Sequence, residues 1–291
     1  RHLFLPQLPI EQVYRDDPIV TLYDEHKQPI SSSSQPAIMA LMLEMLALAP
    51  GQRVLEIGAG TGYNAALMAT IVGEQGAVVA MDIDQDIVVE ANRHLAVAGF
   101  SGVRVLMGDG AEGCNAFAPF DRIILTVGAG DIALAWRDQL ALRGRLVLPL
   151  TLRCTPRVVA FERTSKTILR SVQVTLGGFM PLRGIESPTQ HVHTLPQTGG
   201  LPIWSDRIET LDLDAIRLAL AGEYGSLPTG VHVDNVSSWR GWGLWVELND
   251  PAYGQAYLEK KGDRSGYQQA IGLLEGGQVA LIAAGRRARS S

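Results

Sequence analysis

The stretch VLEIGAGTGYN, residues 54–64, decides the fold of this 291-residue chain. It places an acid and three glycines, Gly58, Gly60 and Gly62, between an apolar β-branched run and a run with helical spacing. In a doubly wound α/β sheet, such a turn lies at the carboxyl end of a parallel strand, where ligands bind. Glycines let a ligand approach the backbone closely, and the following helix offers unpaired N–H groups. A dinucleotide fingerprint needs a glycine where Tyr63 stands, so the pattern argues against an NAD site.

Outward from this turn, short β-branched runs alternate with helical runs, which predicts a parallel sheet with crossover helices. The hairpin-like segment 157–176, with its turn near Thr164 to Lys166, is expected to add antiparallel strands at the end of the sheet. The fold class is therefore α/β, with a Rossmann-like doubly wound sheet. The predicted strands are 53–58, 77–83, 103–108, 121–127 and 145–150, and the predicted helices are 63–72, 86–99 and 131–140.

The composition changes after Gly184, where Pro, Gly, Thr and His become frequent and periodicity is lost. Such a segment is typical of a linker or a long loop. We expect a first domain at 1–184, a linker at 185–200 and an extra C-terminal domain at 201–291. Within the extra domain, 204–222 has helical spacing, whereas 242–250 and 276–285 resemble strands.

The extra domain is rich in tryptophan. It holds Trp204, Trp239, Trp242 and Trp245, four of the five tryptophans in the chain. These side chains predict either a small hydrophobic core or a surface that grips a peptide, because Trp anchors interfaces well. The sequence leaves both alternatives open.

Two acids follow the glycine turn at the ends of the next two predicted strands. Asp82 closes the second strand, where a carboxylate can accept hydrogen bonds from both hydroxyls of a ribose. Asp109 closes the third strand, where it could meet the amino group of an adenine. Each acid alone is more often a loop residue or a helix cap. Together with the glycines, at three consecutive strand ends, they predict a site for a nucleoside cofactor.

Four serines, Ser31 to Ser34, stand directly before an apolar run with helical spacing, in SSSSQPAIMALMLEML. Pro36 suits the first position of a helix, so the cap is expected on or next to Gln35 or Ser34. A capping hydroxyl accounts for one serine. The other serines need a separate account.

Composition excludes several classes of partner. The net charge of −5, without a basic run, argues against a nucleic-acid track and against binding to an anionic membrane surface. Cys114 and Cys154 lack the spacing of a disulfide framework or a zinc site, and His191 and His193 lack a third ligand, so no metal is expected. No apolar run reaches the roughly 20 residues that span a bilayer. We therefore expect a soluble, cytoplasmic protein.

Residues 1 to about 184 resemble the protein-L-isoaspartate O-methyltransferase family of class I methyltransferases. The resemblance rests on RHLFLP, SSSSQP, EIGAGTGYNAALMA, GDG, APFDRIILTVGA, LRGRLVLPL and GFMPLRG, in this order. It implies S-adenosylmethionine as cofactor, S-adenosylhomocysteine as product, and a peptide carboxylate as methyl acceptor. The cofactor-binding residues that it implies are Glu56, Gly58, Ala59, Gly60, Thr61, Gly62, Asp82, Ile83, Asp109 and Gly110.

By the same resemblance Ser34 falls on the family's active-site serine, and we expect Ser32, Ser33 and Ser34 to be catalytic. The family usually has Thr-Ile-Ser here, so Ser33 replaces an apolar residue. Asp131 and the extra C-terminal domain are two further departures. All three resemble methyltransferases that modify ribosomally made peptides. This resemblance implies methylation of an aspartate in a precursor peptide, followed by closure of the ester to an aspartimide.

The chemistry needs little from the protein, because a carboxylate with a pKa of about 3.9 is already ionised at neutral pH. Serine hydroxyls can donate to one carboxylate oxygen while the other oxygen attacks the methyl group. The alternatives are a general isoaspartate repair methyltransferase and a non-catalytic, cofactor-bound peptide-binding module. A small-molecule carboxyl methyltransferase is a third, because fold does not fix the substrate.

Overall fold

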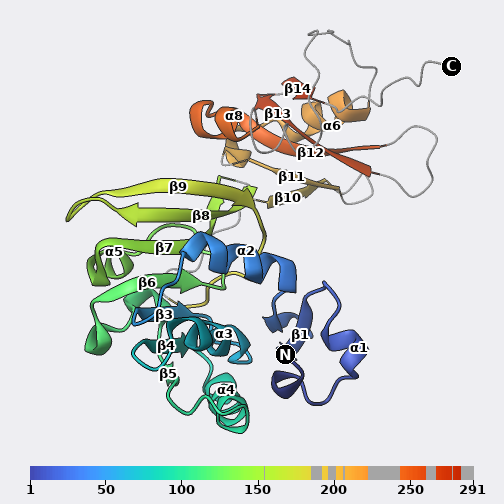
Figure 1. Cartoon of the computed structure of the whole chain (residues 1–291). Coiled ribbons are helices and arrows are strands. Elements are labelled where there is room, and N and C mark those ends of the chain that lie inside the picture. Colours follow the sequence, from blue (N-terminus) through green and yellow to red (C-terminus); the bar gives the residue numbers. More distant parts are fainter. Residues whose placement is uncertain are drawn as a thin grey trace, which may run out of the picture. The chain divides into compact units, whose positions relative to one another are not determined.

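The computed structural model describes residues 1–153, 155–184, 192–195, 201–205, 207–221, 243–259, 267–276 and 278–282. The chain divides into two compact units, one of residues 1–151 and 156–188 and the other of residues 152–155 and 189–291. Figure 1 labels their helices and strands. Cys154, His191, Trp239 and Trp242 lie outside the described residues, as does most of the predicted linker.

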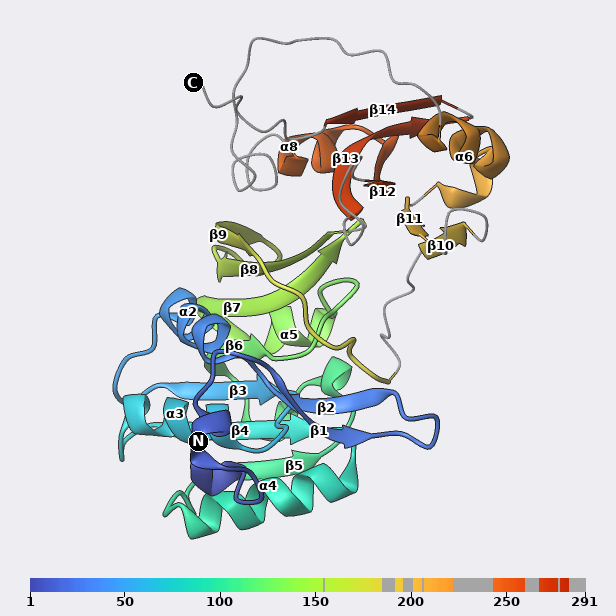
Figure 2. The same cartoon turned by 90° about the vertical axis from the view of Figure 1, so that its right-hand side faces the viewer.

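The first unit is built on a seven-stranded sheet with the order β5-β4-β3-β6-β7-β8-β9. The strands β3 to β7 run parallel, and β8 and β9 form the antiparallel hairpin that the sequence predicts. The sheet therefore confirms the doubly wound α/β class (Figures 1 and 2). The strands are β3 (Arg53–Ile57), β4 (Ala77–Asp82), β5 (Arg104–Met107), β6 (Phe120–Leu125), β7 (Leu140–Leu152), β8 (Thr155–Arg163) and β9 (Leu169–Leu176).

Helices cover the sheet where the periodicity predicts them. The helices are α2 (Pro36–Leu46), α3 (Tyr63–Val72), α4 (Gln85–Val97) and α5 (Leu134–Gln139). Buried side chains of α2, α3 and α4 share one core with the sheet residues Val54, Val78 and Ile124. The helix α5 starts later than the predicted residue 131, because Ala133 is its extended N-cap.

A hairpin of β1 (Ile19–Tyr23) and β2 (Pro29–Ser33) precedes α2 and forms a separate two-stranded sheet. Ser31, Ser32 and Ser33 therefore belong to a strand. The N-terminal elements before the hairpin are the 3₁₀ helix η1 (His2–Phe4) and α1 (Ile10–Val13). The short 3₁₀ helices η2 (Gly110–Glu112) and η3 (Asn115–Phe117) follow β5.

The start of α2 corrects one expectation. Gln35 is the N-cap residue, as predicted, but no side chain of that residue caps the helix. The carboxylate of Asp16 does so instead, since it accepts from the Ala37 N–H at 2.8 Å and from Gln35 Nε2 at 2.9 Å. The serine-cap interpretation was wrong, because the carboxylate of Asp16, about 20 residues upstream, accepts the hydrogen bond from the first turn of the helix.

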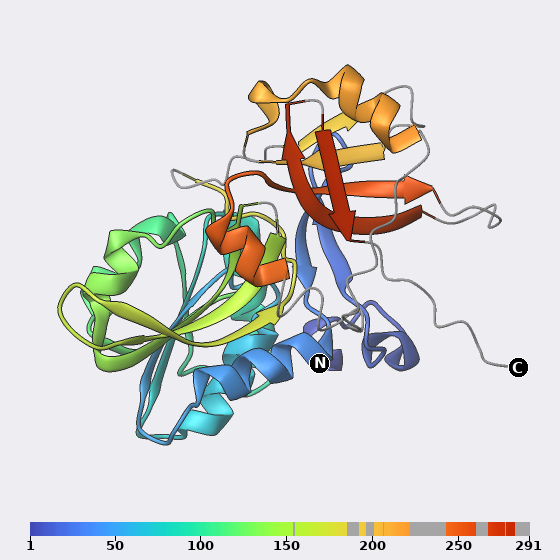
Figure 3. The same ribbon diagram turned by 90° about the horizontal axis from the view of Figure 1, so that it is seen from above.

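The second unit contains a five-stranded antiparallel sheet with the order β10-β11-β12-β13-β14. Its core joins Ile216 of α6 to Ile203, Ala256 and Leu274 of the sheet, and Figure 3 shows this sheet in colours from golden yellow to red. The elements are β10 (Val192–Leu195), β11 (Leu201–Trp204), η5 (Ile208–Thr210), α6 (Leu213–Ala221), α8 (Gly243–Asn249), β12 (Tyr253–Glu259), β13 (Tyr267–Glu275) and β14 (Gln278–Ile282).

One predicted strand of this unit is wrong. Residues 242–250 were expected to be extended, but Gly243–Asn249 form helix α8. The helix buries Val246 and leaves Trp245 and Leu248 exposed. Seven residues are too few for periodicity to separate a helix from a strand, so the secondary structure of this segment depends on its packing.

Candidate active site

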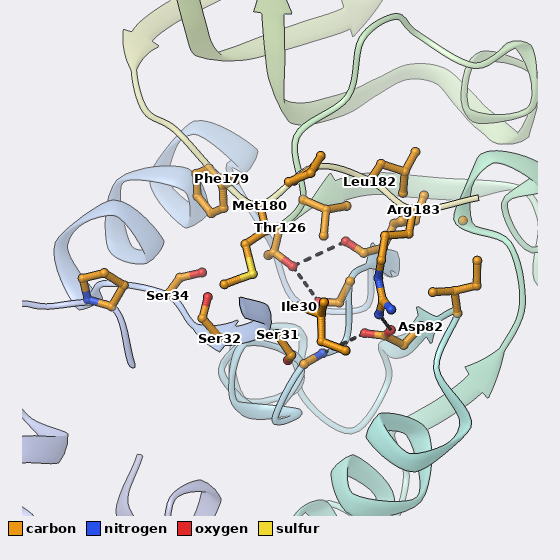
Figure 4. Close-up of a pocket in the computed structure, with 18 of the residues that line it drawn as sticks. Ile30, Ser31, Ser32, Ser34, Asp82, Thr126, Phe179, Met180, Leu182 and Arg183 are labelled. Carbon is orange, nitrogen blue, oxygen red and sulfur yellow. Dashed lines mark hydrogen bonds and ion pairs between the residues drawn. The ribbon is translucent and has the colours of Figure 1, made fainter. Parts of the chain in front are cut away.

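A cavity of about 400 Å³ opens at the carboxyl ends of β3, β4 and β6, where the strand order reverses (Figure 4). This switch point is the place where open α/β sheets bind ligands. Its floor is the glycine loop with the ends of β4 and β6. Two segments from opposite ends of the first unit face each other across it, namely the β1–β2 hairpin with the start of α2, and residues 178–183.

The glycine loop is fixed to β4 and leaves its backbone open to the cavity. The N–H groups of Gly58 and Ala59 both donate to Met81 O at 2.9 Å. Gly58 has a φ of +95°, and a Cβ added to it would lie 2.8 Å from Thr126 Oγ1. Glycine is therefore required here by both conformation and space.

Asp82 lies at the cavity wall and holds the loop from the other side. Its Oδ2 accepts from the Gly60 N–H at 3.2 Å, and its Oδ1 accepts from the Asp84 N–H at 3.4 Å. Arg183 Nη2 lies 3.9 Å from Asp82 Oδ1. Burial raises the pKa of Asp82, while these N–H donors and the Arg183 charge oppose the rise. The carboxylate therefore lies at the cavity with the positively charged Arg183 beside it.

The four serines contact different parts of the first unit. Ser32 and Ser34 line the large cavity, and Figure 4 shows their side chains near Met180. Ser31 also borders the cavity, but its Oγ accepts from Thr21 Oγ1 at 3.0 Å. Ser33 Oγ accepts from the Arg1 guanidinium at 3.4 Å. Of the three predicted catalytic serines, two therefore offer hydroxyls to the large cavity, and Ser33 serves a structural contact.

Below the serines, a smaller cavity of about 20 Å³ contains Glu56. Glu56 is fully buried, and its Oε1 accepts from Asn64 Nδ2 at 2.8 Å. Its Oε2 and Asn64 Oδ1 have no hydrogen-bond partner in the part of the chain that the structure describes. Burial raises the pKa of Glu56 to about 8, and the Asn64 hydrogen bond opposes this rise. Glu56 is therefore a mostly neutral acid under the glycine loop at pH 7.

The structure does not bring all predicted site residues to one surface. Gly58, Gly60, Asp82, Ile83 and Gly110 line the large cavity with Ser32 and Ser34. Ser33, Glu56, Ala59 and Thr61 line only the smaller one.

Gly62 and Asp109 line neither cavity. Gly62, with φ +83°, packs against Leu95 of α4. Asp109 Oδ1 accepts from the Ala111 N–H at 2.9 Å and caps η2, and Gly184 lies against the same carboxylate. The predicted contact of Asp109 with an adenine stays a prediction.

Residues 178–183 form a strap that site prediction missed. The strap is tied to the loop after β6, because the Gly128 N–H donates to Met180 O and the Leu182 N–H donates to Gly128 O, both at 2.7 Å. It brings Phe179, Met180 and Arg183 to the cavity (Figure 4). The motif GFMPLRG was the only signal of this role in the sequence.

The family described as Protein-L-isoaspartate(D-aspartate) O-methyltransferase (PCMT) matches residues 1–187. This chain belongs to that family. A Protein-L-isoaspartate O-methyltransferase of Thermotoga maritima is 42% identical over 153 residues, which cover 53% of this chain and 48% of the relative. Protein-L-isoaspartate O-methyltransferase 2 of Archaeoglobus fulgidus is 34% identical over 184 residues, covering 63% of this chain and 81% of the relative. The match thus spans about half the length of the Thermotoga maritima protein.

Solved structures agree with the PCMT fold. A protein-L-isoaspartate O-methyltransferase structure has a TM-score of 0.57 at 33% identity, over 64% of this chain and 62% of the other. A Plasmodium falciparum protein described as a putative PCMT, in complex with S-adenosyl-L-homocysteine, has a TM-score of 0.52 at 20% identity, over 63% of this chain and 85% of the other. The second likeness concerns the fold alone. Both matches support the class I methyltransferase architecture.

The described residues contain no cluster of three or more His, Cys, Asp or Glu side chains that could hold a metal ion. In the same described ranges, no helix has the length and apolar character needed to cross a membrane.

Proposed function

We propose that the chain is an S-adenosylmethionine-dependent O-methyltransferase that acts on the carboxylate of isoaspartyl residues, the substrate named for its relatives. The observation that carries this proposal is the single cavity lined by the Ser32 and Ser34 hydroxyls, the glycine loop and Asp82. An acceptor carboxylate and a nucleoside cofactor could meet there with the hydroxyls between them.

The residues present fit the cofactor. A cavity of about 400 Å³ is within the usual range for small-molecule sites. Asp82 offers a carboxylate to ribose hydroxyls, and Ile83, 38% exposed, offers an apolar side chain to a base. Gly58 and Gly60 let the ligand approach the backbone, since a Cβ at Gly58 would intrude. When bound, S-adenosylmethionine supplies a methyl group carried on a positively charged sulfur.

The acceptor side of the cavity provides orientation and removes water. The hydroxyls of Ser32 and Ser34 can donate hydrogen bonds to one oxygen of the acceptor carboxylate, which leaves the other oxygen free to attack the methyl group. Apolar side chains of Val20, Ile38 and Phe179 border the same cavity and limit water around the reacting atoms. The acceptor is already ionised at neutral pH, so positioning is the main task.

Paired peptides test the proposal. Two synthetic peptides of one sequence, with isoaspartate or aspartate at one position, are incubated with the protein and methyl-labelled cofactor. We expect label in the isoaspartyl peptide, and a loss of about tenfold or more in Ser34→Ala for one missing donor. Ser101→Ala, at an exposed serine, is the matched control. Absence of label from every peptide, with intact cofactor binding, would favour a peptide-binding module without activity.

A second candidate is methylation of an aspartate in a dedicated precursor peptide, with closure of the ester to an aspartimide. The extra C-terminal unit favours it, because remote contacts can orient a specific substrate. The serine at position 33 does not favour it, because the Ser33 hydroxyl contacts Arg1 and Ser33 does not line the large cavity. Mass spectrometry separates the candidates. A gain of one methyl group followed by loss of methanol in the peptide that contains aspartate supports the second candidate.

A further inference from the structure

Arg1 has the most extensive set of polar contacts around the serine segment. Its side chain is buried, with 7% of the residue exposed. Nη1 donates to Val13 O at 2.7 Å and to Arg15 O at 3.2 Å. One guanidinium thus joins the end of α1 to the turn that leads into the β1–β2 hairpin.

The other edge of the same guanidinium reaches the serines. Nη2 donates to Ser34 O at 2.9 Å and to Ser33 O at 3.4 Å, and Nε donates to Ser33 Oγ at 3.4 Å. The contacts are made to the backbone at the point where β2 ends and the cavity-lining Ser34 begins. Arg1 touches neither cavity, so it cannot act on a ligand directly.

The segment that carries Arg1 is anchored beside the glycine loop. Phe4 is buried, and its ring centroid lies 5.5 Å from that of Tyr63 and 6.1 Å from that of His94. His94 Nδ1 lies 3.2 Å from Thr61 O, in the glycine loop itself. The loop, the ring cluster and Arg1 therefore form one connected set of contacts that ends at Ser34.

We propose that Arg1 is a positioning residue for methyl transfer, which holds the Ser34 backbone, and hence its hydroxyl, at a fixed place relative to the glycine loop. The inference rests on the role proposed for Ser34. The planar guanidinium suits this task, because its rigid fork contacts several carbonyl oxygens at once, which an ammonium on a flexible stem does not do. A small displacement of a positioning group lowers the rate of transfer more than the affinity for either ligand.

Five single variants and one double variant test this role in the full chain. Arg1→Met removes the fork and keeps an unbranched apolar stem, Ser33→Ala removes only the weaker hydroxyl contact, and Arg170→Met is the control at an exposed arginine on β9. The readouts are kcat and KM with an isoaspartyl peptide, the Kd of S-adenosylhomocysteine, and hydrogen exchange of the amides of residues 31–35. The double variant combines Arg1→Met with Ser34→Ala.

In Arg1→Met we expect kcat to fall by about tenfold or more, faster exchange at residues 31–35, and KM and Kd within about twofold of the parent. Arg1→Lys should recover part of the rate. In the Ser34→Ala background, Arg1→Met should have little further effect on kcat, because Arg1 acts through Ser34.

Two results would overturn the role of Arg1. One is an unchanged kcat in Arg1→Met, and the other is a full additional loss of rate in the Ser34→Ala background. Failure of the proposed function has a different signature, since the parent protein itself would then transfer no methyl group to the isoaspartyl peptide. Hydrogen exchange reports the loosening of the serine segment in either case, without reference to activity.

Discussion

At the scale of single residues, Asp82 combines two tasks in one carboxylate. It accepts the Gly60 N–H, which fixes the glycine loop, and it lies in the cavity wall beside Arg183. The binding of a ligand to this carboxylate therefore also depends on the position of the glycine loop. The sequence motif alone would have assigned Asp82 only the contact with the ligand.

Replacing Asp82 should weaken cofactor binding. Asp82→Asn loses a charge-assisted acceptor for ribose hydroxyls, at a cost of about 1–3 kcal/mol, or about 5- to 150-fold in Kd. Titration calorimetry with S-adenosylhomocysteine measures the change, and Asp86→Asn, on the exposed surface of α4, is the control. An unchanged Kd in Asp82→Asn would mean that another group binds the ribose.

Glu56 should make the stability of the first unit depend on pH. Burial raises the pKa of Glu56 to about 8 in the folded chain, above its ordinary value of 4.5. Between these two values the folded state holds a proton that the unfolded state has lost. The free energy of unfolding therefore falls as the pH rises through this window, by up to about 1.4 kcal/mol per pH unit.

Glu56→Gln tests this prediction, because the amide keeps the shape but has no titration. Urea unfolding at pH 5.5, 7 and 8.5 should show a steeper loss of stability for the parent than for the variant. The contribution is fully present below pH 4.5 and absent above pH 8. Parallel pH profiles for the two proteins would contradict a buried, protonated Glu56.

At the scale of elements, the start of α2 depends on a residue outside the helix. The Asp16 carboxylate accepts from Gln35 Nε2 and from the Ala37 N–H, and so ties the turn before β1 to the helix that follows β2. Gln35 itself lines the cavity beside Ser34. The cap and the end of the serine segment are therefore one structural unit.

Removing this cap should lower stability and loosen the helix start. Asp16→Ala should reduce the free energy of unfolding by about 1 kcal/mol, the usual cost of losing an N-cap acceptor. Asp17→Ala is the matched control, because Asp17 is also exposed and only its backbone oxygen contacts Arg1. Chemical denaturation measures both variants. Equal stability of the two variants would show that Asp16 does not cap α2 in solution.

At the scale of the whole molecule, the division into two compact units predicts that they have separable roles. All residues that line the cavities belong to the first unit. Residues 152–155 belong to the second unit although they run from the last residue of β7 to the first residue of β8, so the boundary is not a single cut in the sequence. We propose that cofactor binding resides in the first unit and that the second contributes to substrate choice.

A chain that ends at Pro188 should therefore fold and bind S-adenosylhomocysteine with a Kd within about twofold of the full chain. Methylation of a short isoaspartyl peptide should be retained if the general activity is correct. Selective loss of activity toward a longer precursor would instead support the dedicated substrate. Circular dichroism confirms folding before either assay. A truncated chain that folds but no longer binds the cofactor would show that the second unit completes the site.

The sequence by itself determined the central sheet, the glycine loop and the position of Asp82. Each of these depends on a local pattern of five to fifteen residues, and parallel strands bring their carboxyl ends to one edge without further information. The prediction of α3 at 63–72 agrees with its observed bounds, because Gly62 before it and Gly73 after it interrupt the apolar spacing. The resemblance to the family likewise rested on motifs that are contiguous in sequence.

Only the tertiary structure decided which side chains of these motifs meet. Ser33 turns to Arg1 and Ser32 lines the cavity because strand pairing fixes the face of each residue, and pairing joins segments that sequence spacing does not relate. The strap reaches the cavity through hydrogen bonds to Gly128, about fifty residues earlier, and α8 took a helical form through packing. Long-range contacts of this kind set orientation, and orientation determines which hydroxyls and carboxylates are available for chemistry.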